Sequence, residues 1–201
     1  MLQKTFNLAL GCSVLSWGIM RLVHSPPTRR WSTVNLAIVT LYFVVAWLIF
    51  GRRPIIGRVS SYGWLAGFLS LGAGALVLEL APPPDQWSTG SCIAFVSATC
   101  WVIASLVTLG KSFAVMPVYR TLVSHGPYQL VRHPAYLGEI VLLLVATWES
   151  FSIIGTVLFL VSVLFVVARI TEEEKSFGRI KSSVYSNYQS VVQFRLIPYL
   201  W

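Results

Sequence analysis

Chemically reactive side chains are concentrated in two polar blocks of this otherwise apolar sequence. The first block runs from Gly126 to Gly138 and contains Arg132, His133 and Pro134 in succession. Proline disfavours helix at the residue before it and favours the first turn of a helix, so this triplet predicts the entrance to a helix. The free amides of a helix start and the forked donors of arginine both bind anions such as a carboxylate or a phosphate. The alternative is that the pair only anchors a helix end at the lipid headgroups.

The second block combines carboxylates with two phenols. Its members are Arg169, Ile170, Thr171, Glu172, Glu173, Glu174, Tyr185 and Tyr188. In one unbroken helix, Tyr185 would lie about 20° and Tyr188 about −40° around the axis from Glu174, so one face would carry all three. Gly178 is the position at which such a helix could break. Two alternatives stay open: Thr171 and Glu174 form a capping box that starts a new helix, or the acidic run is a solvated surface.

The composition indicates that the elements carrying these blocks are solvated by a bilayer. Of the 201 residues, 56% are hydrophobic and 11% are charged, whereas soluble domains carry about 25% charged residues. The mean hydropathy is +0.72. This composition excludes a soluble enzyme, a disordered chain and a nucleic-acid-binding domain, and anionic headgroups explain the net charge of +8 without a nucleic-acid partner. The three cysteines lie in apolar segments without CxxC spacing, so we expect neither a disulfide framework nor a metal site.

The predicted fold is all-α, a polytopic membrane helix bundle. Four stretches approach the roughly 20 residues that a spanning helix needs; they are Phe6–Val23, Val34–Phe50, Tyr62–Leu80 and Ser91–Leu109. A fifth apolar region, Tyr136–Ala168, is divided by Trp148-Glu149-Ser150 and predicts a C-terminal helical hairpin, followed by a tail helix. The first arm of the hairpin, Tyr136–Thr147, is a partial span of about 18 Å. Gly63 and Gly67 predict close helix packing.

Lysine and arginine predict the orientation of the bundle. Twelve of the fifteen lie on the side of the N-terminus, the second and fourth loops and the tail: Lys4, Arg52, Arg53, Arg58, Lys111, Arg120, Arg132, Arg169, Lys175, Arg179, Lys181 and Arg195. The other three are Arg21, Arg29 and Arg30. Because basic loops stay in the cytoplasm, we expect a multi-pass integral membrane protein with its N-terminus and both blocks on the cytoplasmic side. The first apolar stretch is interpreted as a retained transmembrane helix rather than a signal peptide.

Together the two blocks resemble the signatures of the isoprenylcysteine carboxyl methyltransferase family, a group of membrane methyltransferases related to phospholipid N-methyltransferases. The first block matches every fixed position of the family's G-P-Y-x-x-V-R-H-P-x-Y-x-G run. The second resembles R-I-x-x-E-E, two tyrosines three residues apart and a terminal R-L-I-P-like end, here Arg195 to Pro198. The resemblance divides one integrated membrane domain into N-terminal transmembrane helices, residues 1–109, and a methyltransferase region, residues 110–201.

The resemblance implies that S-adenosylmethionine is the cofactor, bound without a Rossmann domain by the two blocks. The implied cofactor-binding residues are Tyr128, Arg132, His133, Pro134, Tyr136, Leu137, Gly138, Glu173, Glu174, Tyr185 and Tyr188, and the implied catalytic residues are Arg132, Glu174 and Arg195. The anionic end of the cofactor suits the arginine–histidine entrance, its ammonium and ribose hydroxyls suit Glu173 or Glu174, and its sulfonium suits aromatic faces. Val191 stands where many members have a basic residue of the acceptor pocket, and Arg195 is the candidate substitute.

The implied activity is methyl transfer to a lipophilic acceptor at the cytoplasmic membrane face, with carboxyl O-methylation of an isoprenylcysteine-like substrate favoured. The alternative is a phospholipid or other lipid amine N-methyltransferase, in which Glu174 or His133 is the candidate base. A membrane sterol-type reductase and a non-enzymatic membrane protein are the alternatives of other classes. Ionisable residues within the spans are scarce, which argues against transport. The expected partners are a lipophilic or lipid-modified substrate and membrane lipids, with no nucleic acid.

Overall fold

The computed structural model describes residues 2–52, 60–113, 122–180 and 182–201, which form helices joined by short turns. Their elements in chain order are α1 (Leu2–His24), α2 (Pro27–Arg30), α3 (Thr33–Gly51), α4 (Ser61–Leu80), η1 (Pro84–Gln86), α5 (Thr89–Leu109), η2 (Gly110–Ser112), η3 (Gly126–Gln129), α6 (Pro134–Ser150), α7 (Ile153–Ile180) and α8 (Ser182–Val191). The described residues contain no strand, so the predicted all-α fold is confirmed.

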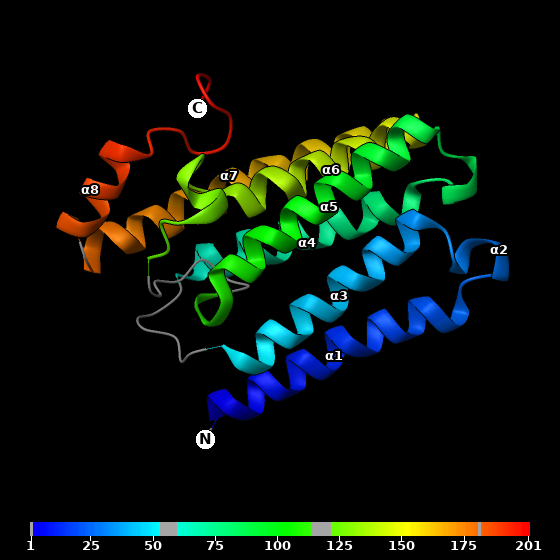
Figure 1. Ribbon diagram of the computed structural model, residues 1–201, viewed down its shortest axis with the longest axis horizontal. Helices are drawn as coiled ribbons and strands as arrows, with labels where there is room; N and C mark the ends of the chain where they lie inside the picture. Colours follow the sequence, from blue (N-terminus) through cyan, green and yellow to red (C-terminus); the bar gives the residue numbers. More distant parts are fainter. Residues whose placement is uncertain (1, 53–59, 114–121, 181) are drawn as a thin grey trace.

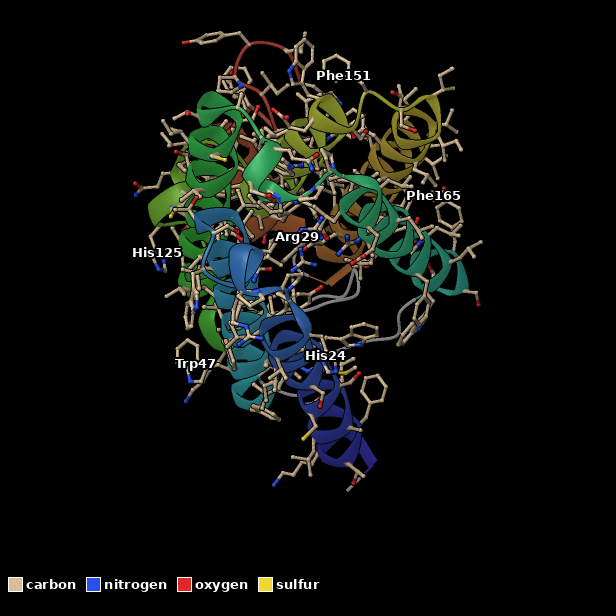
Figure 2. The ribbon with its side chains drawn as sticks, turned by 90° about the vertical axis from the view of Figure 1, so that its right-hand side faces the viewer. His24, Arg29, Trp47, His125, Phe151 and Phe165 are labelled. Carbon is tan, nitrogen blue, oxygen red and sulfur yellow. The ribbon has the colours of Figure 1, made fainter. Side chains whose placement is uncertain are left out.

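Within the described residues, five helices are long and apolar enough to cross a membrane. They cover Lys4–His24, Thr33–Gly51, Ser61–Leu80, Thr89–Ser112 and Ile153–Arg179. The first four correspond to the four predicted spans, and their outward faces carry large apolar side chains. Trp47 is 64% exposed and points away from the bundle in Figure 2. The chain is therefore a multi-pass helical membrane protein.

The predicted hairpin is present as α6 and α7. The chain reverses after Ser150, where Phe151 adopts a left-handed backbone conformation with φ of 43°. The first arm is longer than the predicted Tyr136–Thr147, because α6 already begins at Pro134. Its 17 residues span about 25 Å, so it remains shorter than the five membrane-spanning helices.

Serine residues fix where three of the spans begin. Ser32, Ser60 and Ser88 each precede a helix, and each side-chain oxygen accepts a hydrogen bond from the backbone amide three residues later. These caps satisfy amides that the first turn leaves unpaired, at about 1 kcal/mol each. They explain why α3, α4 and α5 begin one or two residues before the predicted apolar stretches.

The helices alternate in direction, so the chemical blocks gather at one end of the bundle. Figure 1 shows the N-terminus, η3, α8 and the C-terminal residues toward the left, and the α2, η1 and α6–α7 turns at the right. We call the left end, which carries residues 122–133 and 182–201, the motif end. The predicted grouping of the N-terminus, fourth loop and tail holds for the residues that the structure describes. Four of the counted basic residues lie outside them: Arg53, Arg58, Arg120 and Lys181.

Helix packing leaves space between α3 and α4. The closest associations are α4 with α7, α1 with α3, and α5 with α6, whereas the consecutive helices α3 and α4 scarcely touch. On α4, Gly63, Gly67, Ser70 and Gly74 lie on the buried face. A Cβ atom at Gly74 would lie 3.2 Å from Leu143 Cδ1, so a larger residue there would press on α6. The small-residue spacing therefore serves close packing, as predicted.

The region after Arg169 departs from two of the sequence alternatives. Because α7 continues without a break to Ile180, Thr171 does not cap a new helix, and its hydroxyl instead donates to the Val167 carbonyl at 2.9 Å. The unbroken helix through Tyr188 is also wrong, since α8 begins at Ser182, beyond the suspected break at Gly178. The phenols reach the glutamates because α8 packs beside the end of α7 (Figure 1).

Candidate active site

The C-terminal segment holds the arginine–histidine entrance in place. The backbone amides of Arg132 and His133 donate to the carbonyls of Phe194 and Arg195, both at 2.9 Å. Immediately afterwards Pro134 starts α6, whose first turn has no side-chain cap. Arg132 and His133 therefore pair with the C-terminal segment through their backbones, and the unpaired amides of the first turn of α6 point toward the motif end.

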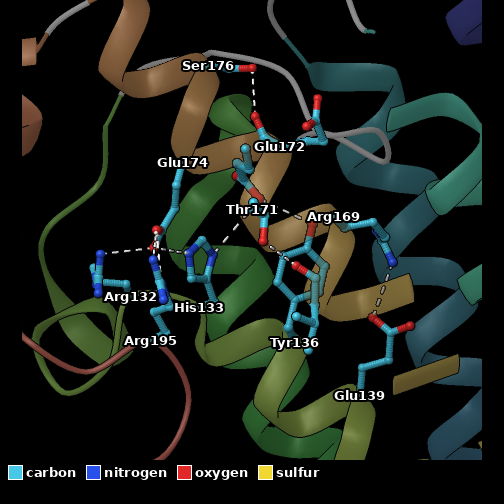
Figure 3. Close-up of polar contacts among 12 residues, drawn as sticks. Arg132, His133, Tyr136, Glu139, Arg169, Thr171, Glu172, Glu174, Ser176 and Arg195 are labelled. Atoms are coloured by element: carbon cyan, nitrogen blue, oxygen red, sulfur yellow. Dashed lines mark hydrogen bonds and ion pairs between the residues drawn. The ribbon is translucent and has the colours of Figure 1, made fainter. Parts of the chain in front are cut away.

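Glu174 is the anchor of the site and is surrounded by the nitrogen atoms of two arginines and a histidine. Arg132 Nη1 lies 2.9 Å and His133 Nε2 3.2 Å from its Oε1. Arg195 contacts the other oxygen, with Nε at 3.0 Å and Nη2 at 2.9 Å from Oε2 (Figure 3). The Glu174 side chain is only 9% exposed. This carboxylate therefore joins α7, the helix entrance and the C-terminal segment, and both its oxygens are occupied.

Glu173 is the accessible carboxylate. Tyr136 donates to its Oε2 at 3.2 Å, and His133 Nδ1 lies 4.0 Å from the same oxygen. The Glu173 side chain is 26% exposed and lines a cavity inside the bundle, whereas Glu174 does not. It is consequently the acidic group best placed to meet a ligand.

Glu172 points away from both Glu173 and Glu174 and contacts the start of α4. Ser60, the cap of α4, donates to Glu172 Oε2 at 2.7 Å, and Lys175 Nζ lies 3.0 Å from Oε1. Successive residues of a helix point about 100° apart, so three adjacent glutamates serve three different purposes. Glu172 ties α7 to the start of α4, where the helix dipole favours a negative charge.

Aromatic rings of η3, α7 and α8 form one wall. Tyr188 donates to the Tyr128 carbonyl at 2.7 Å, and the Phe177 and Tyr185 rings stack at 5.2 Å. The Tyr185 hydroxyl and Arg132 Nε are buried, and neither makes a hydrogen bond of normal geometry with a described residue, although the hydroxyl lies close to Arg132 and Glu174. Burial raises the pKa of Tyr185, and the negative charge of Glu174 raises it further. The phenols are therefore neutral at physiological pH.

Substitution of Tyr188 by phenylalanine is expected to remove the pH dependence that this phenol gives to folding. Burial raises the pKa of Tyr188 to about 12, against the opposing charge of Arg132. A folded-state pKa above the unfolded value of 10 means that stability is full below pH 10 and falls as the pH rises toward 12. Thermal unfolding of the purified protein from pH 8 to 11 should show a smaller decline for Tyr188→Phe, although lower stability at pH 8, by about 1–3 kcal/mol. Parallel declines would contradict this assignment.

One continuous cavity of about 470 Å³ connects this site with the interior of the bundle. At the motif end its walls are Tyr128, Arg132, His133, Tyr136, Glu173, Phe177, Tyr185 and Tyr188. Deeper in the bundle its walls are mostly apolar side chains of α1, α3, α4, α5 and α6, among them Val14, Ile38, Leu78, Phe95 and Leu142. The space between α3 and α4 belongs to this cavity. A polar, aromatic chamber thus opens into a lipid-like chamber.

The predicted site residues fall into two groups. The cavity-lining ones are Tyr128, Arg132, His133, Tyr136, Glu173, Tyr185 and Tyr188; those outside its lining are Pro134, Leu137, Gly138, Glu174 and Arg195. Gly138 is a packing position, since a Cβ atom there would clash with Val102. Leu137 packs against the buried Val166 and Ile170. Val191 is 77% exposed and does not line the cavity.

Sequence reasoning missed several cavity residues. Arg169 belongs to the second block but carries no predicted role in the site, and Glu139 stands one residue beyond the first block. Both line the cavity, as does Phe177. The only available signal for Glu139 was a carboxylate inside an apolar stretch.

Comparison with known protein families finds a match that includes much of this site. The model of the isoprenylcysteine carboxyl methyltransferase (ICMT) family matches residues 91–179. The match runs from α5 to near the end of α7, so it includes the helix entrance and all three glutamates, whereas Tyr185, Tyr188 and Arg195 lie beyond it. No protein with a curated description matches the chain.

Proposed function

We propose, from the premise that this chain belongs to the isoprenylcysteine carboxyl methyltransferase family, that it methylates the carboxylate of an isoprenylcysteine-like lipophilic acceptor with S-adenosylmethionine. The observation that carries the proposal is the continuous cavity with a polar, aromatic end and an apolar interior. A water-soluble cofactor fits the first part and a lipid tail the second. In this assignment residues 110–201 supply most of the methyl-transfer site, and residues 1–109 supply much of the apolar wall.

The residues at the motif end fit the cofactor. Arg132 Nε and the Tyr185 hydroxyl are buried polar atoms that make no hydrogen bond of normal geometry with the described residues. The uncapped start of α6 adds backbone donors for a carboxylate. Glu173 is positioned to accept from an ammonium or a ribose hydroxyl. The faces of Tyr136 and Tyr185 suit a sulfonium cation.

The chain's task in this reaction is to hold two ligands and exclude water. S-adenosylmethionine would be held by Arg132, Glu173 and the first turn of α6, and it would supply an electrophilic methyl group for the acceptor carboxylate, with the electron pair of the broken carbon–sulfur bond remaining on sulfur. Collinear placement of the reacting atoms is the main source of rate. A carboxylate is ionised at neutral pH and needs no base. Glu174 and Arg195 are positioning residues in this scheme, since Glu174 orients Arg132 and Arg195 secures Glu174.

A defined assay tests the proposal. Purified protein in lipid nanodiscs is incubated with methyl-tritiated S-adenosylmethionine and N-acetyl-S-farnesylcysteine, and the extracted product is treated with base. The proposal predicts label that base releases as methanol, because methyl esters hydrolyse and N-methyl groups do not. Base-stable label in endogenous lipid would instead support the lipid amine N-methyltransferase, for which His133, of the two candidate bases His133 and Glu174, lines the cavity. No label in any extract would contradict both.

A larger side chain inside the apolar chamber is expected to affect only the acceptor. Ala75 on α4 is exposed to the cavity, so Ala75→Trp fills it without entering a packed interface. We expect the KM for the farnesylated acceptor to rise about 5-fold to 150-fold, as overfilling a pocket costs about 1–3 kcal/mol, while the Kd for S-adenosylmethionine stays unchanged. Leu76→Trp, at the next residue and outside the cavity lining, is the control. Equal effects of the two variants on KM would count against a tail in this chamber.

We also propose that the motif end faces the cytoplasm, on the strength of the basic residues gathered there. The test is labelling of introduced cysteines in intact cells by a membrane-impermeant maleimide, after replacement of Cys12, Cys92 and Cys100. Ser190→Cys, on α8, should be protected until the cells are opened, and Asp85→Cys, on η1, should react at once. The reverse pattern would overturn the orientation.

A further inference from the structure

A second polar layer lies in the cavity wall, about one helical turn further into the bundle than Tyr136 and Glu173. Arg169 on α7 directs Nη1 to Ser70 Oγ of α4 at 3.0 Å and to Glu139 Oε2 of α6 at 3.6 Å. Its guanidinium carbon also lies 4.7 Å from the centroid of the Tyr136 ring (Figure 3). One arginine therefore joins three helices and connects this layer to the site above it.

Glu139 is the accessible member of this layer. Its side chain is 24% exposed, whereas that of Arg169 is 5% exposed. Both line the cavity, and the neighbouring lining residues one turn deeper, Leu142 and Leu143, are apolar. A carboxylate thus faces the cavity where it becomes lipid-like. Such a group is costly without a hydrogen-bond donor, and ionisable residues inside membrane bundles are generally functional.

The surroundings of Glu139 indicate which kind of ligand group could contact its carboxylate. Arg169 already balances its charge, so a second cation gains little. An anion would meet the carboxylate before the covered guanidinium. A hydrocarbon tail alone would leave the carboxylate oxygens unsolvated. A neutral N–H group satisfies the oxygen without adding charge, and hydrogen bonds to an ionised acceptor are among the strong ones.

The position of Glu139 along α6 agrees with contact to an amide N–H of the acceptor. Glu139 follows Tyr136 by three residues on α6, which places it about 4.5 Å deeper along the helix axis. In an N-acylated cysteine the carboxyl carbon and the amide nitrogen are attached to the same α-carbon, about 2.5 Å apart, so a side chain one helical turn from the site is close enough to meet the amide N–H. An acceptor with its carboxylate at the level of Tyr136 and Glu173 would carry an adjacent amide N–H near Glu139, and its tail below.

We propose that Glu139 is a specificity-determining residue that accepts a hydrogen bond from a neutral amide N–H of the acceptor, beside the reacting carboxylate, and that Arg169 positions it. The inference rests on the proposed function and deepens it. The acceptor is accordingly an N-acylated or peptidyl S-prenylcysteine, and a prenyl thioether acid without nitrogen is a poorer substrate.

The test compares two acceptors that differ only in this group. N-acetyl-S-farnesylcysteine carries the N–H, and S-farnesyl-3-mercaptopropionate lacks the whole amide. For the wild-type protein we expect kcat/KM to favour the first by about tenfold or more. Glu139→Leu should bring the ratio close to one by raising the KM of the amide acceptor, with the Kd for S-adenosylmethionine unchanged. Glu139→Gln, which keeps an acceptor oxygen, should retain part of the preference.

Controls separate the inference from loss of structure and from failure of the proposed function. Glu139→Leu combined with Arg169→Met removes both charges and should also show a ratio near one, so the comparison stands even where the single variant does not fold. Glu149→Gln, near the far end of α6, should keep the wild-type ratio. Equal use of the two acceptors by the wild type, or an undiminished ratio in Glu139→Leu or in the double variant, would overturn the inference alone. Methylation of neither acceptor by the wild type would overturn the proposed function and the inference with it.

Discussion

Substitution of Glu174 by glutamine is expected to lower the free energy of unfolding by about 3 kcal/mol, because removal of one partner from a buried ion cluster leaves its other charges unpaired. Arg132, His133 and Arg195 all depend on this carboxylate, and the first two are themselves buried or nearly so. The same change should weaken binding of S-adenosylmethionine about 100-fold, because Arg132 and the C-terminal segment would no longer be held together by the Glu174 carboxylate. Thermal unfolding in detergent and titration calorimetry measure the two effects.

The neighbouring Glu172 supplies a matched control for this prediction. Glu172→Gln removes the same charge from the same helix, but its partners are Ser60 and the half-exposed Lys175. An ion pair with a largely exposed lysine contributes about 0–1 kcal/mol, so both stability and cofactor affinity should change little. Comparable losses for the two variants would show that the acidic run acts through its total charge, and would contradict the assignment of Glu174 as an anchor.

Substitution of Glu173 by alanine is expected to separate binding from stability. Glu173 receives one neutral hydrogen bond, from Tyr136, and faces the cavity with a quarter of its side chain exposed. Its loss should therefore cost the fold about 1 kcal/mol or less. If it accepts from the ammonium or ribose of the cofactor, the Kd for S-adenosylmethionine should rise about 30-fold to 100-fold, because hydrogen bonds to charged groups are roughly twice as strong as neutral ones.

Calorimetry on Glu173→Ala and Arg132→Ala measures this loss directly, with the unfolding temperature recorded for each. Arg132→Ala should lose cofactor affinity together with stability, because it both lines the cavity and pairs with Glu174. Glu173→Ala should lose affinity alone. Unchanged affinity in Glu173→Ala would remove the accessible carboxylate from the binding site.

Much of the fold follows from local features of the sequence. Hydropathy over stretches of about 20 residues locates spanning helices, and serine caps at Ser32, Ser60 and Ser88 set their starts. Trp148-Glu149-Ser150 marks the reversal of the hairpin, since polar residues interrupt the apolar run there. The proline rule likewise predicts that α6 begins at Pro134, as it does.

The remaining features depend on contacts between distant segments, which no local pattern encodes. The pairing of Arg132 with Phe194 joins residues far apart in the chain through backbone atoms alone, so side-chain identities carry no trace of it. The separate duties of Glu173 and Glu174 depend on which direction of α7 faces α6 and the C-terminal segment. Helical periodicity places both tyrosines on one face with Glu174 only if the helix is continuous. In the structure a separate helix, α8, begins at Ser182 and packs beside the end of α7, which brings the tyrosines close to Glu174. Part of the apolar chamber is built by α1, α3 and α4, which lie outside the family match.

The most direct measurement is a crystal structure of the protein in lipid with bound S-adenosylhomocysteine, the demethylated form of the cofactor. The proposal predicts the nucleotide at the motif end of the cavity, with its amino-acid end between Arg132 and Glu173 and its sulfur pointing toward the apolar chamber. Density for the ligand outside this cavity, or a sulfur atom directed toward water, would contradict it.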